Sequence, residues 1–419
     1  MIKNFSIENF QSIKEEVNVS FVASALTDET MFTNYFDFKE EKILKVLAFY
    51  GINASGKSTI VRALAALREL VIPSYQPAPG SILINPVLPY YPFKFSNETR
   101  KSVTSMKIEF SPDNSNDSSV FRYSVSYNGA RIYQEKLEKL TSQKYSLVYL
   151  RETKENNQSS ISFGNIVSNI QLLEALKGSL VPNRTFLSLF SSFKVADFVD
   201  AYYFFERMVN ISPEVTRFDD LVPNEIENNE KLSEFIVKLL KAADFNIDAF
   251  HVSKSKRSIQ NLPGLVAEKK SLFLDHNVEY DDKSIEFIQE SLGTKKIIVI
   301  GMHLFNALSK PSTMIVDELE ASLHPELTKL IVTLFLDESV NTHNSQLIFT
   351  SHETTLLDLD LLRRDEIYFV YKKRDTGATY INPLKDFSMR KDSSISKSYL
   401  SGRFSTSPNV NENEMIGVN

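Results

Sequence analysis

Apolar and polar residues alternate at the start of the chain. Phe5 and Ile7, and then Val17, Val19 and Phe21, are separated by polar positions. This period of two residues is typical of strands that bury one face. The N-terminal region is therefore predicted to form β-structure.

A different pattern follows at residues 43–50, where the sequence ILKVLAFY is apolar except for one lysine. Such a run predicts a strand that is covered on both faces. A turn containing glycine comes next, and residues 58–70 (STIVRALAALREL) fit a helix. A strand, a turn and a helix are thus predicted to follow one another directly.

Residues 104–150 return to alternation, which predicts an antiparallel β subdomain. Residues 121–127 (FRYSVSY) alternate and lead into Asn128 and Gly129, the pair that favours a type I′ hairpin turn. Residues 145–150 are the next candidate strand.

Residues 163–250 are predicted to be helical. One apolar stripe at helical spacing supports this, formed by Leu232, Phe235, Ile236, Leu239, Leu240 and Ala243. The chain has no sustained heptads, so no coiled-coil arm is expected. Strands are predicted again at 313–316, 346–350 and 366–371, with helices between them, and the polar tail after Ser405 is expected to fray.

The first chemical motif lies between the apolar strand and the helix that follows it. It has the form GxxxxGK[ST] and comprises Gly51, Ile52, Asn53, Ala54, Ser55, Gly56, Lys57, Ser58 and Thr59. Its glycines allow backbone N–H groups to wrap phosphates, and the helix N-terminus favours an anion. Lys57 is predicted to reach the β- and γ-phosphates of ATP, and the Ser58 hydroxyl to bind Mg²⁺.

A second motif closes the predicted strand at 313–316. Asp317 and Glu318 follow four residues with no charge. Paired with the phosphate loop, Asp317 is predicted to hold Mg²⁺ through water, and Glu318 to act as the general base toward the attacking water.

Three further segments indicate which class of phosphate-loop protein this is. Ser291, Gly293 and Thr294 lie in ESLGTKK at a predicted helix start, where hydroxyl and N–H groups can bind an anion. Residues 320–325 (EASLHP) resemble a D-loop. His352 follows the predicted strand at 346–350 and could hydrogen-bond a γ-phosphate.

In this order and spacing the motifs resemble the RecF/SMC-like branch of ABC ATPases, within the group related to overcoming-lysogenization-defect proteins. The stretches ESLGTKK, DELEASLHPEL and TSHETTLLD carry the resemblance. The region from LLRRDEIYFVYK to the end of the chain is especially similar to the RloA, AbiLi and PARIS-type ATPase subunits of phage defence. One departure is that no Q-loop glutamine is assigned, because Gln76 is too close to the phosphate loop and Gln134 lies past the predicted hairpin.

The resemblance implies an α/β P-loop NTPase of ABC/SMC-head type, with a mixed β-sheet, flanking helices, an antiparallel β subdomain and a helical insertion. The expected division is an N-terminal ATPase lobe (1–162), a helical insertion (163–270), a C-terminal ATPase lobe (271–404) and a polar tail (405–419). It further implies a homo-oligomer of at least two chains, in which ATP and Mg²⁺ lie between the phosphate loop of one copy and the signature of the other.

The same resemblance implies a regulatory ATPase of a bacterial antiphage system that controls a separate effector, such as a TOPRIM-type nuclease. No nuclease is expected on this chain, since about 65 residues follow His352. One alternative is a RecF-like repair ATPase that binds DNA directly. Another is a scaffold that binds ATP without hydrolysing it, against which the presence of Glu318 argues.

Composition changes this picture in two respects. The formal net charge is −6, so no global basic field favours nucleic acid, although a basic cluster is present at Lys254, Lys256, Arg257, Lys269 and Lys270. With no cysteine, no apolar signal core and no apolar run long enough to cross a bilayer, we expect a cytoplasmic protein without a membrane segment.

Overall fold

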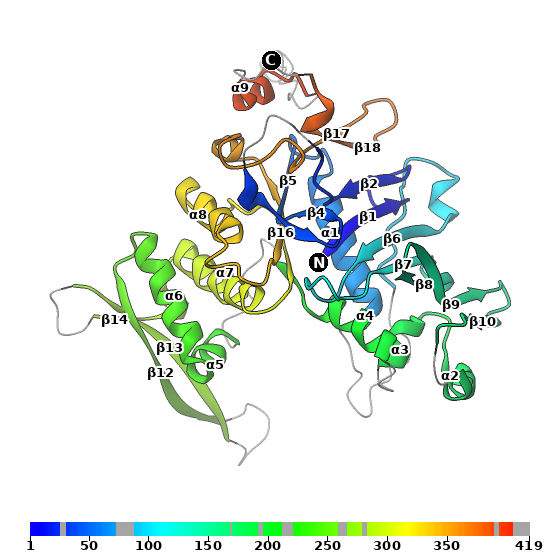
Figure 1. Ribbon diagram of the computed structural model, residues 1–419. Helices are drawn as coiled ribbons and strands as arrows, with labels where there is room; N and C mark the ends of the chain where they lie inside the picture. The colour runs from blue at the N-terminus through cyan, green and yellow to red at the C-terminus, as the bar shows by residue number, and fades with distance from the viewer. Residues whose placement is uncertain are drawn as a thin grey trace, which may run out of the picture.

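The computed structural model contains a mixed core sheet, a second, antiparallel sheet and a small lateral lobe (Figure 1). It describes residues 1–25, 31–72, 88–167, 170–191, 196–211, 221–258, 266–278, 283–388 and 394–404. The tail at 405–419 and Gln76 lie outside these ranges.

The core sheet has six strands, and its parallel strands end at one edge. In spatial order they are β11 (Met208–Ile211), β15 (Thr313–Val316), β16 (Gln346–Ser351), β5 (Val46–Tyr50), β17 (Ile367–Lys372) and β18 (Thr379–Pro383). All neighbours are parallel except β17 and β18. The strands predicted at 313–316, 346–350 and 366–371 are therefore confirmed. The apolar run at 43–50 is divided at Lys45, and only its second half joins this sheet.

Helices cover both faces of the core sheet. On one face lie α1 (Lys57–Val71) and α4 (Ala196–Glu206), and on the other α7 (Leu292–Leu308) and α8 (Pro325–Leu336). Leu47 and Phe49 of β5 pack in the hydrophobic core on the side of α1 and α4. The other three residues of the strand pack in the core on the side of α7 and α8. A strand with apolar residues on both faces is buried on both, as the continuous run predicted.

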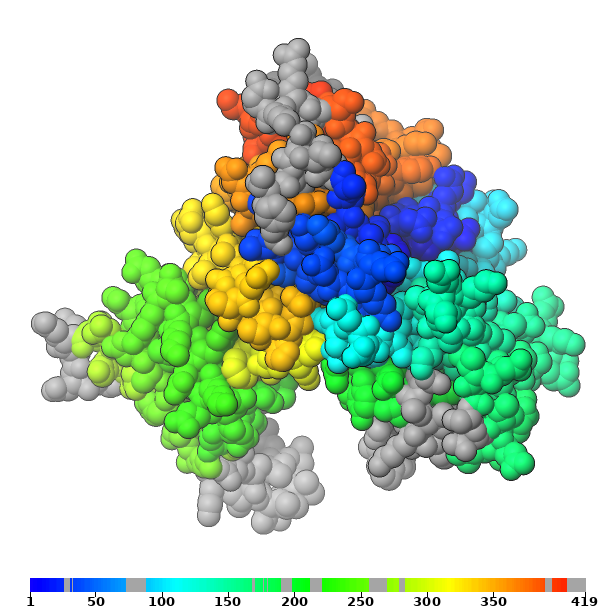
Figure 2. Space-filling view, viewed as in Figure 1, coloured from blue at the N-terminus to red at the C-terminus, as the bar shows by residue number. Residues whose placement is uncertain are grey.

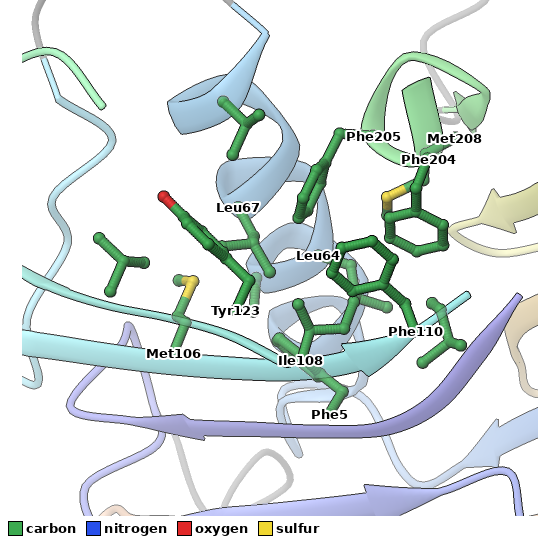
Figure 3. Packing of buried hydrophobic residues seen from close by; sticks show 14 of the residues in the cluster. Phe5, Leu64, Leu67, Met106, Ile108, Phe110, Tyr123, Phe204, Phe205 and Met208 are labelled. Atoms are coloured by element: carbon green, nitrogen blue, oxygen red, sulfur yellow. The ribbon is translucent and has the colours of Figure 1, made fainter. Parts of the chain in front are cut away.

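The second sheet is antiparallel throughout and has seven strands. Their order is β10 (Ser159–Phe163), β9 (Lys144–Thr153), β8 (Ile132–Thr141), β7 (Phe121–Tyr127), β6 (Thr104–Phe110), β1 (Ile2–Glu8) and β2 (Val17–Ser20). Its inner face packs on α1 and α4 through aromatic and aliphatic side chains (Figure 3). The predicted antiparallel subdomain is thus confirmed, and the N-terminal strands belong to it.

The turn between β7 and β8 differs from the type I′ turn that Asn128 and Gly129 favour. Four residues connect the strands, and neither Asn128 nor Gly129 has a positive φ. The Asn128 side chain instead accepts hydrogen bonds from the amides of Ala130 (2.9 Å) and Arg131 (3.0 Å). The hairpin is confirmed, and its turn is closed by the asparagine side chain.

The expected helical insertion at 163–270 is wrong in two places. Helices α2 (Ile170–Leu176), α3 (Phe186–Ser191), α4, α5 (Leu221–Asn228) and α6 (Glu230–Ala242) do occupy much of it. However, β11 joins the core sheet, and β12 (Ile247–Ser258) pairs with β13 (Val266–His276) and β14 (Ser284–Glu286) in a separate sheet. Residues of β12 are mostly polar, so their alternation gave little hydrophobic signal, and pairing with β13 decides their conformation.

The separate sheet, α5 and α6 form the lateral lobe. Figure 2 shows it (green) separated by a notch from the antiparallel sheet (teal). Shorter elements complete the described chain: β3 (Tyr35–Phe38), β4 (Glu41–Leu44), α9 (Ile395–Leu400) and the 3-10 turns Phe32–Asn34, Thr99–Lys101, Lys177–Ser179, Phe287–Gln289, Thr354–Leu356 and Leu384–Asp386. None of the helices in the described ranges has both the length and the apolar character needed to cross a membrane.

A buried charge pair joins the antiparallel sheet to the helices beside α1. Glu135 on β8 and Arg151 on β9 have fully buried side chains whose charged groups lie 3.6 Å apart. The Glu135 carboxylate also accepts hydrogen bonds from Tyr123 (3.0 Å) and from the backbone amides of Phe186 (2.7 Å) and Leu187 (3.1 Å) at the start of α3. One carboxylate therefore satisfies groups from a strand and a helix.

We expect Glu135→Ala to lower the free energy of unfolding by about 3–5 kcal/mol, because it leaves the Arg151 cation buried without its partner. Urea unfolding followed by circular dichroism measures this. Glu152→Ala, at an exposed position on the neighbouring strand, is the matched control. Equal stability of the two variants would contradict the assignment.

Candidate active site

The phosphate loop joins β5 to α1 and has the backbone of an anion cradle. Gly56 caps α1 with φ of 106°, a conformation that favours glycine. A Cβ on Gly51 would lie 2.3 Å from the Val370 carbonyl oxygen of β17, so this position also has no room for a side chain. Asn53 and Ala54 are exposed at the loop tip, and Ala54 is left-handed at 63°.

Two segments far away in sequence support the back of this loop. The Thr379 hydroxyl of β18 donates to the Ser55 carbonyl oxygen at 2.8 Å, and a Cβ on Gly56 would approach that hydroxyl to 2.3 Å. The Ser12 hydroxyl lies 3.0 Å from that of Thr59. Sequence reasoning missed Ser12 and Thr379, since a lone hydroxyl residue carries no motif.

Lys57 is buried within the loop, and no ion pair joins it to a carboxylate of the residues that the structure describes. Its ammonium donates to the carbonyl oxygens of Gly51 (2.8 Å) and Ile52 (3.2 Å). Burial lowers its pKa to about 8, against the opposing effect of nearby carboxylates, of which Glu320 and Glu318 are the strongest. A buried cation resting on neutral carbonyls is ready to bind an anion.

Asp317 receives hydrogen bonds from two other segments. Its Oδ1 accepts from the Ser58 hydroxyl at 2.9 Å and from the Thr350 hydroxyl at 2.7 Å. Thr350 in turn accepts from the Glu318 amide at 2.8 Å. Thr350, the last residue predicted for that strand, was not assigned a role, and only the pairing of β15 with β16 places it here.

The Ser58 hydroxyl and the Asp317 carboxylate together fit Mg²⁺. A hydroxyl and a carboxylate are the hard oxygen ligands that Mg²⁺ takes while it keeps waters and phosphate oxygens. Within the described residues no group of three or more acidic or histidine side chains forms an all-protein metal site. Ser58 and Asp317 are thus suited to a magnesium ion that arrives with nucleotide.

Glu318 occupies a turn immediately after β15. Its φ is 52°, which is uncommon for a residue with a side chain and is often found at functional sites. The Leu319 amide then donates to the Thr350 carbonyl oxygen at 3.1 Å. Glu318 is partly exposed, whereas Asp317 beside it is 6% exposed, so solvent reaches the Glu318 carboxylate more readily.

His352 lies beside Lys57 in the structure. Its Nδ1 is 3.4 Å from the Lys57 ammonium, and its backbone amide donates to Glu320 Oε1 at 2.6 Å. Burial, and next the Lys57 cation, lower the pKa of His352 below its usual 6.5, so the ring is neutral at pH 7. The role of the Glu320 side chain in holding this backbone was not predicted.

The signature residues lie apart from these groups in the same chain. The Ser291 hydroxyl caps α7 by accepting from the Thr294 amide at 3.1 Å, and Leu292 is 70% exposed. In the described chain, no hydrogen bond joins Ser291, Gly293 or Thr294 to the phosphate loop. The signature instead touches the segment after β15: a Cβ on Gly293 would lie 3.4 Å from Ser322 O, and buried Lys296 donates to Ala321 O.

The other two predicted elements are placed as follows. The D-loop candidate continues into α8, where His324 is the N-cap and its ring accepts from the Glu326 amide at 3.3 Å. Gln134 lies on β8 and is exposed, so the Q-loop stays unassigned.

Comparison with known proteins identifies a family for this chain. Residues 46–358, about three quarters of the chain, match the family described as "AAA domain, putative AbiEii toxin, Type IV TA system". The chain belongs to this family. It therefore carries an AAA-type P-loop ATPase domain, whose matched residues run from β5 through the phosphate loop to beyond His352. No curated protein matches the chain.

Solved structures of SMC heads match most of this chain at low identity and TM-scores of 0.39. The SMC head domain from Thermotoga maritima matches at 13% identity and a TM-score of 0.39, over 91% of this chain and 98% of that one. The Smc head bound to the C-winged helix domain of ScpA matches at 13% identity and 0.39, over 93% and 98%. A Smc head with an extended coiled coil, bound to the C-terminal domain of ScpA and derived from Pyrococcus furiosus, matches at 11% and 0.39, over 92% and 97%.

We expect the affinity for ATP to fall as the pH rises above about 8. Phosphate raises the pKa of Lys57 from about 8, so binding is strongest below that pH, where Lys57 is already protonated. Above it, Kd should increase by up to about tenfold per pH unit. Isothermal titration calorimetry between pH 7 and about 9.5 measures this. Lys57→Ala should bind weakly with no such slope, and an equally steep slope in that variant would refute the attribution.

We expect Thr350→Val to weaken binding of ATP–Mg²⁺ about five- to tenfold, because Asp317 and the Glu318 amide each lose a hydrogen-bond partner. Binding of ATP without the metal should change less. Thr350→Ser keeps the hydroxyl and is the matched control. Unchanged Mg²⁺-dependent affinity in Thr350→Val would show that Thr350 does not position Asp317.

Proposed function

We propose that this chain hydrolyses ATP as the regulatory subunit of a bacterial antiphage defence system in the cytoplasm. The observation that carries the hydrolytic part is the shared carboxylate of Asp317, bonded to Ser58 on the phosphate-loop side and to Thr350 on the next strand. Two further observations support one common site: the Lys57 ammonium lies 3.4 Å from His352 Nδ1, and Glu318 follows Asp317 just after β15.

The proposed chemistry assigns each group a separate task. Lys57 binds the β- and γ-phosphates, Ser58 and Asp317 hold Mg²⁺, and neutral His352 hydrogen-bonds the γ-phosphate. Mg²⁺, when bound, neutralises charge on the phosphate oxygens. Glu318, which is partly exposed at the strand end, orients and deprotonates the attacking water.

We propose that the site is completed by a second copy of the chain. Ser291 is exposed at the start of α7, a helix of 17 residues, and the exposed Leu292 beside it is apolar. The helix start offers N–H groups and a hydroxyl to a phosphate, and its own phosphate loop does not use them. Ser291, Gly293 and Thr294 would therefore bind the γ-phosphate held by the partner copy.

The regulatory role rests on the family and on the resemblance noted above. The description of the matched family names a putative AbiEii toxin and a type IV toxin–antitoxin system. The sequence resembles the RloA, AbiLi and PARIS-type subunits, which favours a separate effector such as a TOPRIM-type nuclease. Closure around ATP would then set the shape of the assembly that the effector recognises.

Direct DNA binding is less well supported. Lys254 and Lys270 of the basic cluster lie opposite each other on β12 and β13, and both pair with Glu227 at 2.6 Å. Their charge is therefore partly neutralised within the lateral lobe. The side chains of Lys256, Arg257 and Lys269 lie outside the described residues.

We expect Glu318→Gln to bind ATP–Mg²⁺, to hydrolyse it at least about 10²-fold more slowly, and to accumulate as an assembly of at least two copies. Mass photometry or light scattering with and without nucleotide measures the assembly. Adding Ser291→Arg should block the mass increase while the single-chain site still binds ATP. Ser309→Arg, exposed at the other end of α7, is the matched control.

Two outcomes would overturn parts of this proposal. Normal ATP turnover by Glu318→Gln would show that Glu318 is not the general base. A molecular mass that changes neither with nucleotide nor with Ser291→Arg would show that no site is shared between copies. Co-purification with the product of the neighbouring gene tests whether a separate effector binds this chain. Salt-sensitive, ATP-dependent binding to duplex DNA by the chain alone would favour the repair ATPase instead.

A further inference from the structure

Two exposed aromatic rings lie on the segment that precedes β6. Tyr91 is 54% exposed and Phe95 is 75% exposed, whereas Phe93 between them is 1% exposed. Large aromatic side chains left in solvent at neighbouring positions are unusual and often mark a binding surface. Each outer ring meets one buried ring edge-on, Tyr91 that of Phe10 and Phe95 that of Phe93, and most of each outer side chain is open to solvent.

This segment is held firmly to the turn after β1. The Phe93 amide donates to Asn9 Oδ1 at 2.9 Å, and the Asn9 side-chain amide donates to the Thr99 and Val103 carbonyl oxygens at 2.9 and 3.0 Å. The Gln11 amide donates to the Tyr91 carbonyl oxygen at 2.5 Å. The backbone under both rings is therefore fixed by buried contacts.

The same turn touches the phosphate loop. Gln11 Oε1 accepts from the Thr59 hydroxyl at 3.4 Å, and the Ser12 hydroxyl lies 3.0 Å from that hydroxyl. Tyr91 is thus one layer of residues away from the start of α1.

Phe95 reaches the phosphate loop by a second route. It packs on Gly377 in the loop between β17 and β18 (Figure 1), where a Cβ would come within 2.9 Å of its ring. Gly377 is followed two residues later by Thr379, whose hydroxyl supports the Ser55 carbonyl oxygen. The Tyr91 backbone is therefore linked to the start of α1 through Gln11, and the Phe95 ring is linked to the phosphate loop through the segment that carries Thr379.

The direction in which a bound nucleotide would lie decides which part of it comes near the two rings. Lys57, Asp317 and His352 mark the γ-phosphate end, and backbone amides at the start of the helix receive the α- and β-phosphates. The nucleoside must then leave the loop on the Thr59 side, away from Asp317. That is the side on which Gln11, Ser12 and the aromatic segment lie.

We propose that Tyr91 and Phe95 form the platform on which the base of the nucleoside triphosphate stacks. This inference rests on the proposed function, since it assumes that the phosphate loop binds a nucleotide. Stacking needs a flat π-face held at low entropic cost, which two anchored rings supply. A purine, with the larger face, is the preferred base.

The test uses full-length Glu318→Gln as the parent, so that ATP is not consumed during titration. Calorimetry compares ATP–Mg²⁺ with inorganic tripolyphosphate–Mg²⁺, which has no base. Tyr91→Ala and Phe95→Ala should each weaken ATP about 5- to 150-fold while tripolyphosphate affinity stays unchanged. Tyr203→Ala removes an aromatic ring that is 44% exposed on α4 and is the matched control.

Phe95→Trp gives a second readout, because the chain contains no tryptophan. Its fluorescence should be quenched by ATP and left unchanged by tripolyphosphate. The platform would be overturned if the alanine variants lost affinity for ATP and tripolyphosphate equally. It would also be overturned if Tyr91→Ala and Phe95→Ala both kept the parent's affinity for ATP. If the parent bound neither ligand, the proposed function itself would fail together with this inference.

Discussion

The chemistry of this molecule depends on one hydrogen-bonded carboxylate. Asp317 Oδ1 accepts from Ser58, 259 residues earlier in the chain, and from Thr350, 33 residues later. These three groups meet because β5, β15 and β16 are parallel neighbours whose carboxyl ends share an edge. Helices on both faces of the sheet and the hydroxyls of Ser12 and Thr379 behind the loop hold that edge in place.

Electrostatics at this edge favour an anionic ligand. Lys57 is buried, its ammonium rests on carbonyl oxygens, and burial has already lowered its pKa. In a low-dielectric environment a cation gains more from a phosphate than it would in water. The neutral ring of His352 beside it adds a hydrogen-bonding group without adding charge.

The loop after β15 connects the nucleotide site to the exposed signature. Lys296, which is 4% exposed on α7, donates to the Ala321 carbonyl oxygen, and Glu320 in the same loop holds the His352 backbone. Contacts from α7 and from the His352 backbone therefore meet in the same loop.

The sequence by itself determined the local chemistry. The GxxxxGK[ST] spacing, the acidic pair after an apolar strand and the helix cap at Ser291 follow from backbone and side-chain properties within a few residues. The pattern of apolar residues also identified β5, β15, β16 and β17 of the core sheet and the stripe of α6, but not β11 or β18. These signals are local, so a single sequence contains them.

Only the tertiary structure decided which distant residues complete the site. Thr350, Thr379 and Ser12 are ordinary hydroxyl residues until strand pairing brings them to the phosphate loop. Strand β12 was placed in a helical insertion, because its conformation comes from pairing with β13 and its mostly polar residues give no clear apolar period. The separation of Ser291 from the phosphate loop was likewise set by where α7 packs, because motif order along a chain does not fix distance in space.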